Sequence, residues 1–139
     1  MKGYKKILIA VNSSREVLLQ GLKLAQDEGC WITVIKVVPP YEGDINLIGI
    51  RNIKDVLNGG GEKTVLGIKD FAKANGGFVK AILEEGKIHK KIVEVAEEEE
   101  CDLIIMGKSR QKGLKKFLGG NILGKVLSTS PCPVLVVDS

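Results

Sequence analysis

The residues that could do chemistry gather in the last part of the chain, between Leu103 and Val137. An apolar run that ends at Met106 and Gly107 leads into a loop rich in lysine and glycine, and the whole segment lacks acidic residues. Its six basic residues give it a charge of +6, whereas the rest of the chain, with 15 basic against 17 acidic residues, carries −2. Glycines let backbone N–H groups converge on a phosphate. The pattern therefore predicts an anion-binding loop at the end of a buried strand.

The basic loop, residues 108–116, allows two main interpretations. It is either a solvated surface loop or an anion site in which the cations supplement the backbone amides of Gly107 and Gly120. A nucleic-acid interface is disfavoured, because the patch is short and only Phe117 lies nearby to stack on bases. We expect no nucleic-acid partner.

A second motif, from Gly119 to Val126, nearly matches the phosphate-binding P-loop. Val126 stands where a P-loop needs Ser or Thr to hold magnesium, and the motif does not directly follow a strand. We therefore expect Lys125 to be a solvated helix residue and Gly124 to allow close helix packing.

Five apolar runs rich in β-branched residues must position these motifs. Their apolar residues are continuous rather than alternating, as in strands that are buried on both faces of a parallel sheet. Helical patterns separate the runs, which predicts a doubly wound α/β fold in a single domain, residues 1–139. The expected strands are Ile7–Val11, Trp31–Val38, Phe78–Leu83, Leu103–Met106 and Val134–Val137.

Apolar stripes at helical spacing predict four helices between these strands. Residues 39 to about 61 are expected to form a mobile loop or a broken helix, because Gly59 to Gly61 interrupt the second pattern. The four stripes are Val17, Leu18, Leu22 and Ala25; Val65, Ile68, Phe71 and Ala72; Ile88, Ile92, Val95 and Ala96; and Ile122, Val126 and Leu127.

Composition excludes several classes of protein. The chain has 139 residues, of which 44% are hydrophobic and 27% charged, and these values are ordinary for a soluble domain. Its apolar runs are far shorter than the roughly 20 residues of a membrane span. The first residues lack the long apolar region and cleavage site of a secretory signal, so we expect a cytoplasmic location.

The three cysteines, Cys30, Cys101 and Cys132, are widely spaced beside strand candidates and are expected to be buried, reduced thiols. His89 is the only histidine, so no zinc-type ligand set can be assembled and no metal is expected.

The stretch from Ile104 to Ser139 resembles the C-terminal signature of the universal stress protein family. Nucleotide-binding members read Gly, two residues, Gly, nine residues, Gly, then Ser or Thr. Gly107 and Gly120 match the first and third glycines, whereas Arg110 replaces the second and Asn121 replaces the hydroxyl residue. The resemblance extends to "KKILIAVNSS" at the start of the chain and to "WITVIKVV" after the first helix.

This resemblance implies a five-stranded parallel sheet with order 3-2-1-4-5 and helices on both faces. In such a sheet the ligand binds where the strand order reverses, at the carboxyl ends of strands 1 and 4. The implied ligand is ATP or another adenine nucleotide. By position its site would comprise Ala10, Val11 and Asn12, then Val37 for adenine, Met106, Gly107 and Arg110, and Gly120, Asn121 and Ile122 for the phosphates.

Asn12 stands where the family's nucleotide binders usually carry aspartate. An amide can bond a hydroxyl but brings no charge to a divalent cation, which further disfavours a metal. The crevice also offers no evident general base, so an enzyme is not expected.

The resemblance implies a non-catalytic stress-response regulatory or sensing protein with a weak ATP site. The alternative is a protein-interaction module of the same family that does not bind nucleotide. We expect a homodimer that pairs the terminal strand, Val134–Val137, across a two-fold axis, because this short apolar edge strand would otherwise expose unpaired backbone groups.

Overall fold

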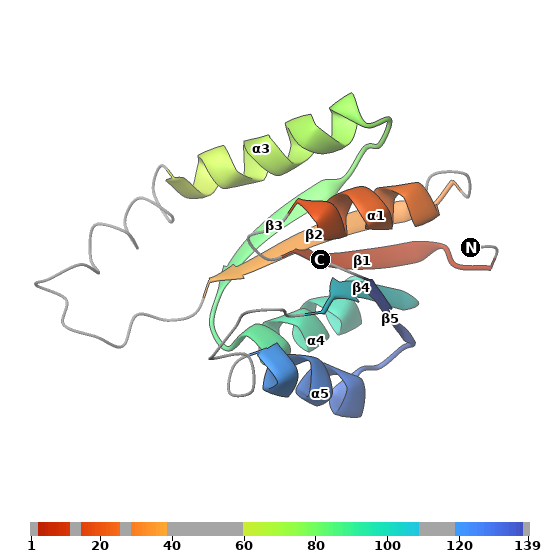
Figure 1. The fold of residues 1–139 in the computed structure, drawn as a ribbon, viewed down its shortest axis with the longest axis vertical. Coiled ribbons are helices and arrows are strands. Elements are labelled where there is room, and N and C mark those ends of the chain that lie inside the picture. The colour runs from red at the N-terminus through yellow and green to blue at the C-terminus, as the bar shows by residue number, and fades with distance from the viewer. Residues whose placement is uncertain (1–2, 12–14, 26–28, 39–59, 109–118, 138–139) are drawn as a thin grey trace, which may run out of the picture.

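The computed structural model shows an α/β fold with one central sheet (Figure 1). For residues 60–64 and 119–121 the structure describes the backbone only. The structure describes residues 3–11, 15–25, 29–38, 60–108 and 119–137.

Five parallel strands form the sheet in the order β3-β2-β1-β4-β5, which confirms the expected topology. From β1 the chain builds outward through β2 to β3 and then crosses back to place β4 on the other side of β1. The strand order therefore reverses between β1 and β4. The strands are β1 (Lys6–Val11), β2 (Trp31–Val38), β3 (Lys80–Glu85), β4 (Leu103–Gly107) and β5 (Val134–Val137).

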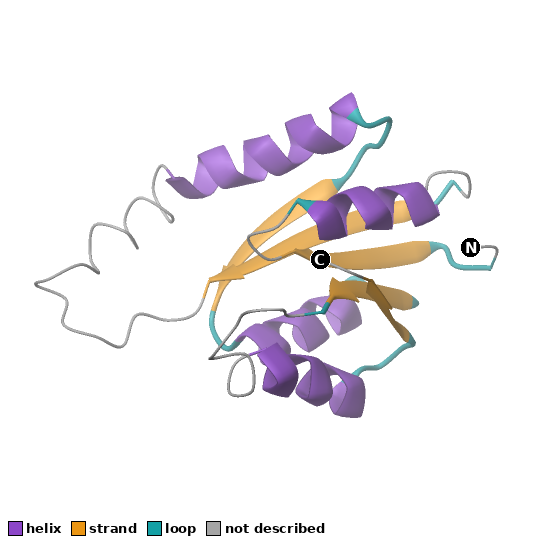
Figure 2. Ribbon diagram, viewed as in Figure 1, coloured by secondary structure: helices purple, strands orange, loops and turns teal. Residues whose placement is uncertain are grey.

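Helices cover both faces of this sheet (Figure 2). One face carries α1 and α3, and the other carries α4 and α5 (Figure 1). The helices are α1 (Glu16–Ala25), α3 (Gly60–Ala74), α4 (Ile88–Glu98) and α5 (Gly119–Thr129). None of the helices within the described ranges is long and apolar enough to cross a membrane.

The sheet separates two hydrophobic clusters, and the central strand β1 contributes side chains to both. Ile7 and Ile9 pack under α1 and α3, whereas Leu8 and Ala10 pack under α4 and α5. Ile7, Leu8 and Ile9 are fully buried. The continuous apolar run is therefore a strand covered on both faces, as the sequence pattern predicts.

The predicted apolar faces of α1 and α4 are largely confirmed, because most of their residues are buried in these clusters. The face of α5 is narrower than expected. Val126 is fully buried, but Leu127 is 53% exposed. A Cβ atom on Gly124 would meet no heavy atom within 4 Å, so the expected close packing at that glycine is wrong.

Two boundaries also differ from the sequence-based expectation. Strand β3 begins at Lys80, whose backbone pairs with Thr33, and Phe78 lies before the strand. Gly60 and Gly61 fall in the first turn of α3, so the glycines do not keep the helix from starting. Pairing with β2, rather than apolar content, sets the start of β3. Residues 39–59 of the expected loop lie outside the described residues.

Candidate functional site

The candidate crevice is built on the neighbouring strands β1 and β4. Ala10 of β1 pairs with Met106 of β4 in the parallel register. Val11 then ends β1 and Gly107 ends β4. Because parallel strands end at the same edge of a sheet, these four residues lie together where the strand order reverses.

The side chains just before these strand ends face the core. Ala10, Val37 and Met106 are all buried in the cluster under α4 and α5. Their side chains are only 6 to 8% exposed, so we expect each to contribute mainly backbone groups to a ligand. Val11 and Gly107, at the strand ends, are half-buried.

The first turn of α5 lies at the same edge of the sheet. Strand β4 ends there, and α5 must return the chain to the start of β5, where Ile104 N–H donates to the carbonyl of Pro133 at 3.0 Å. Gly120 lies in that first turn and Ile122 packs against the cluster under α4 and α5. The first N–H groups of a helix have no partner within the helix and can bind an anion.

The structure thus brings seven of the ten predicted site residues to the carboxyl edge of the sheet. Asn12 and Arg110 lie outside the described residues, as does the side chain of Asn121. The ligand-binding role of all ten stays a prediction. The seven are Ala10, Val11, Val37, Met106, Gly107, Gly120 and Ile122.

Positive charge gathers where α4 and α5 pack together near this edge. The pKa of His89 is lowered by partial burial first, and then by the charges of Lys125 on α5 and of Lys87 and Lys90 around the start of α4. Lys87 is the N-cap of α4, and its side chain makes no capping hydrogen bond. The sequence pattern did not connect His89 with Lys125, because only the packing of α4 on α5 brings them together.

Lys36 is a further cation near this edge that the sequence analysis did not identify. It pairs in register with Val11, so it too lies near the carboxyl edge. Burial lowers the pKa of its ammonium group. The only signal in the sequence was one charged residue inside an otherwise uncharged strand.

The described residues contain no group of three His, Cys, Asp or Glu side chains that could hold a metal ion. Cys30, Cys101 and Cys132 are free thiols; Cys101 is buried and the other two are half-buried. Burial raises the pKa of Cys101 to about 11, so this thiol is poorly suited to act as a nucleophile.

Comparison with models of known protein families identifies the family of this chain. The model of the universal stress protein family matches residues 3–138. This chain belongs to the universal stress protein family. A curated member, universal stress protein MJ0531 of Methanocaldococcus jannaschii, is 32% identical, and the match covers 96% of this chain and 82% of that protein.

Solved structures of universal stress proteins and their relatives share the fold. Protein MJ0577 superposes with a TM-score of 0.75 at 31% identity, over 98% of this chain and 96% of the other. Universal stress protein UspA from Lactobacillus plantarum gives 0.76 at 20% identity, over 96% and 97%. Two further universal stress proteins were solved with cAMP, at 17% identity and a TM-score of 0.72 over 97% of both chains, and with dAMP, from Archaeoglobus fulgidus, at 18% and 0.65 over 97% and 98%.

Proposed function

We propose that this universal stress protein is a cytoplasmic, non-catalytic regulator or sensor that binds an adenine nucleotide weakly at the crevice between β1 and β4. The observation that carries the proposal is the pairing of Ala10 with Met106 immediately before both strands end. That pairing sets the half-buried residues Val11 and Gly107 side by side at the reversal of strand order. Doubly wound folds bind nucleotides at such a point.

Electrostatics near the crevice support an anionic ligand. The N-termini of α4 and α5 both start at the carboxyl edge of the sheet, and each presents backbone donors with a partial positive charge. Lys87, Lys90 and Lys125 add full positive charges where the two helices pack together. A nucleotide phosphate would therefore meet a favourable potential before it makes any direct contact.

The two relatives solved with cAMP and dAMP also support adenine as the base, because they show that this fold accommodates an adenine nucleotide in other members. Arg110, Asn121 and Asn12 depart from the family's nucleotide-binding pattern, so we propose a weak site.

The same three departures favour a second candidate, a protein-interaction module of the family that binds no nucleotide. In that case the crevice would be a structural remnant, and the homodimer would be the functional surface. Both candidates share the proposed pairing of β5 with its copy, since β5 is an edge strand of the sheet.

Backbone NMR of the full chain separates the two candidates. With ATP at about 5 mM, well above a dissociation constant in the tens of micromolar, a nucleotide binder should be saturated. The amide signals of Val11, Gly107 and Gly120 should then shift, while those of Trp31 and Lys80 at the opposite edge should not. Unchanged crevice signals at this ATP concentration would contradict the nucleotide site and favour the interaction module.

A further inference from the structure

Two of the three cysteines lie at the amino ends of neighbouring strands, at the opposite edge of the sheet from the crevice. Cys101 stands two residues before β4, and Cys132 stands two residues before β5. Both side chains pack in the hydrophobic cluster under α4 and α5, so they lie on the same face of the sheet. We call these two residues the cysteine pair.

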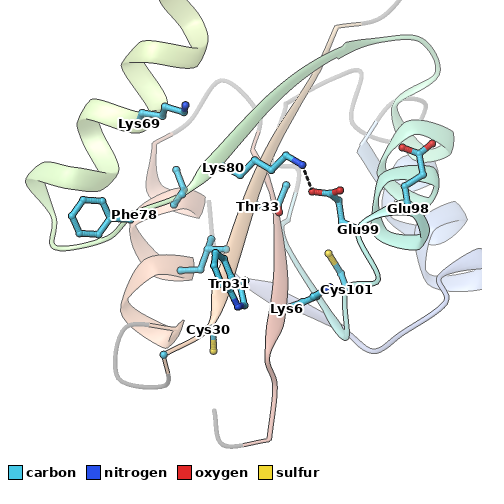
Figure 3. A pocket seen from close by; sticks show the side chains of 13 residues that line it. Lys6, Cys30, Trp31, Thr33, Lys69, Phe78, Lys80, Glu98, Glu99 and Cys101 are labelled. Carbon is cyan, nitrogen blue, oxygen red and sulfur yellow. Dashed lines mark hydrogen bonds and ion pairs between the residues drawn. The ribbon is translucent and has the colours of Figure 1, made fainter.

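The third cysteine is kept apart from the cysteine pair. Cys30 packs in the cluster under α1 and α3, on the other face of the sheet, and its S–H donates to the carbonyl of Tyr4 at 3.0 Å. Figure 3 shows Cys30 beside the exposed Trp31, with its sulfur well apart from that of Cys101. Cys30 is therefore an internal control for any reaction of the cysteine pair.

The pairing of β4 with β5 sets the spacing of the cysteine pair. Ile104 pairs with Val134 in the parallel register. Carried back by two residues, this register sets Asp102 level with Cys132 and leaves Cys101 one residue away. Paired strands lie about 4.8 Å apart and rise about 3.3 Å per residue, so this offset gives a Cα separation of about 6 Å. Disulfides usually join Cα atoms that are about 4.4 to 6.8 Å apart.

The end of α4 fixes the position of Cys101. Glu100 has a φ of 53°, which is a left-handed conformation. Its N–H donates to the carbonyl of Glu97 at 3.1 Å, and Cys101 N–H donates to the carbonyl of Ala96 at 2.8 Å. These two bonds form the Schellman motif that ends many helices. The motif turns Cys101 back under α4, where its side chain is 8% exposed.

The turn before β5 fixes the position of Cys132. This cysteine stands between Pro131 and Pro133, whose rings fix their own φ angles. The Ser130 hydroxyl accepts from Cys132 N–H at 3.2 Å and donates to the carbonyl of Cys132 at 2.6 Å. Both cysteines are therefore held on a constrained backbone, so little conformational freedom is lost when they bond to each other.

The acidity of the two thiols agrees with their proximity. Burial is the largest cause that raises the pKa of Cys101, and the charge of Cys132 is the next. Burial also raises the pKa of Cys132, whereas the Ser130 hydroxyl, 3.9 Å from its Sγ, opposes that rise. Cys132 is half-buried and Cys101 is buried, so an oxidant in solution reaches Cys132 first.

We propose that the cysteine pair is an oxidation site, at which hydrogen peroxide joins Cys101 to Cys132 in a reversible disulfide. Redox-sensitive cysteines are often placed beside a second cysteine that completes the reaction. Such a bond would record exposure to an oxidant in a form that a reductant erases. The inference does not depend on the proposed nucleotide site, because the cysteine pair lies at the opposite edge of the sheet.

The reaction has two steps. The Cys132 thiolate attacks one oxygen of hydrogen peroxide, the O–O bond breaks, and Cys132 becomes a sulfenic acid, while the released hydroxide and the thiol proton form water. The Cys101 sulfur then attacks the sulfenic sulfur. An S–S bond forms, the S–O bond breaks, and the hydroxyl leaves with the Cys101 proton as a second water. The two thiols lose two electrons in all, and one peroxide is reduced to two waters.

Cys101 can complete this reaction although its raised pKa makes it a poor nucleophile toward molecules in solution. The sulfenic acid forms beside it, and two groups held together react far faster than one group with a dilute reagent. Cys101 is therefore expected to react with Cys132 while reagents in solution leave it untouched.

Tryptic peptides of the full chain separate the three cysteines. Cleavage after lysine places Cys30 in residues 24–36, Cys101 in residues 92–108 and Cys132 in residues 126–139. The reduced protein is treated with hydrogen peroxide, the remaining thiols are alkylated, and the peptides are analysed by mass spectrometry without reduction. We expect peptide 92–108 to be joined to peptide 126–139, and the two to separate after dithiothreitol. Cys30 should be recovered in its alkylated form.

Serine variants test the order of the two steps. Cys101→Ser should leave Cys132 as a sulfenic acid that dimedone traps. Cys132→Ser should lower the oxidation of Cys101 at least about ten-fold, because no sulfenic acid forms beside it. Cys30→Ser is the matched control and should form the disulfide at the rate of the unaltered chain.

Several outcomes would overturn the proposal. They are the absence of a bond between the two peptides in the unaltered chain, an equal yield of bonds to Cys30, and a bond found only between separate chains on a non-reducing gel. Oxidation of Cys101 in Cys132→Ser as fast as in the unaltered chain would contradict the proposed order of steps. The first three outcomes need no variant, so they are decisive even where a serine disturbs folding.

Discussion

Ala10 of β1 lies directly beside Met106 of β4, one residue before each strand ends. The two side chains are buried in the same cluster under α4 and α5. A close-packed cluster holds its backbone in place, so the strand ends that follow are rigidly set. The candidate nucleotide site therefore lies at the ends of two buried, close-packed strands.

We predict negligible ATP turnover, far below the roughly 1 per second at the low end of ordinary enzymes. No carboxylate is available at Asn12 to hold a metal, and Val126 removes the hydroxyl of a P-loop. Phosphate release from purified protein and ATP measures this. Several turnovers per minute that disappear in a crevice variant would mean that the protein is an enzyme.

We predict a homodimer through β5. This edge strand, Val134–Val137, carries only apolar residues, and on its outer side the described part of the chain provides no further strand. Pairing with a second copy would satisfy the outer backbone groups. Light scattering at about 100 μM protein should give the mass of two chains, and Val136→Pro should lower it, because proline removes a backbone donor from the strand. A mass of one chain for the unaltered protein argues decisively against the dimer.

Two glycines in helices should respond oppositely to alanine. A Cβ atom on Gly21 of α1 would lie 2.7 Å from Cδ1 and 3.1 Å from Cγ1 of Ile9, which is fully buried. Gly21→Ala should therefore lower the free energy of unfolding by about 1 to 3 kcal/mol. At Gly67 of α3 a Cβ atom meets nothing within 4 Å, so Gly67→Ala should raise it by about 0.5 to 1 kcal/mol.

Urea unfolding of both variants measures this difference. The prediction fails if Gly21→Ala is as stable as the unaltered protein or if both substitutions shift stability in the same direction.

We predict that Cys101 is the slowest of the three cysteines to be alkylated. Burial raises its pKa from 9.0 to about 11, so its thiolate is about a hundredfold scarcer than in the unfolded chain near pH 8. The folded state retains this proton more tightly, so the contribution to stability is present below pH 9 and is lost as the pH rises toward about 11. Mass spectrometry after timed iodoacetamide treatment resolves each cysteine. Cys101 alkylated as fast as Cys30 would contradict the result expected from burial.

Strand identities followed well from the sequence because buried parallel strands leave continuous apolar runs. The expected bounds of β2 and β5 agree with the structure. Phe78 was misplaced because an apolar residue before a strand looks the same in sequence as one inside it. Trp31 was placed in the correct strand, but its exposure depends on where α4 ends, and no local pattern records that.

The candidate site was predictable only in part. The joining of Ala10 to Met106 followed from the family's strand order, and the structure confirms that order. The cations around His89 could not be found from sequence, because Lys125 is 36 positions away and meets His89 only through the packing of α4 on α5. Spacing along the chain carries no information about such pairs.

The central claim, a weak adenine-nucleotide site between β1 and β4, is tested most directly by calorimetric titration of the full chain with ATP and magnesium. The comparison is the variant that combines Asn12→Asp, Arg110→Gly and Asn121→Ser. We predict a dissociation constant in the tens of micromolar or weaker for the unaltered chain. The variant should bind more tightly, because a restored phosphate hydrogen bond contributes about 1.5 to 3 kcal/mol. If the family's loop needs a left-handed backbone at position 110, glycine there also removes a cost of about 1 to 2 kcal/mol.

Arg110→Gly alone shows how that arginine acts. If the unaltered chain binds ATP tightly and Arg110→Gly abolishes binding, Arg110 is a phosphate ligand rather than a defect in the motif. The predicted result is weak heat of binding in the unaltered chain and tighter binding in the triple variant. Absence of binding heat in both, with ATP at millimolar concentration, would contradict a nucleotide site in this crevice.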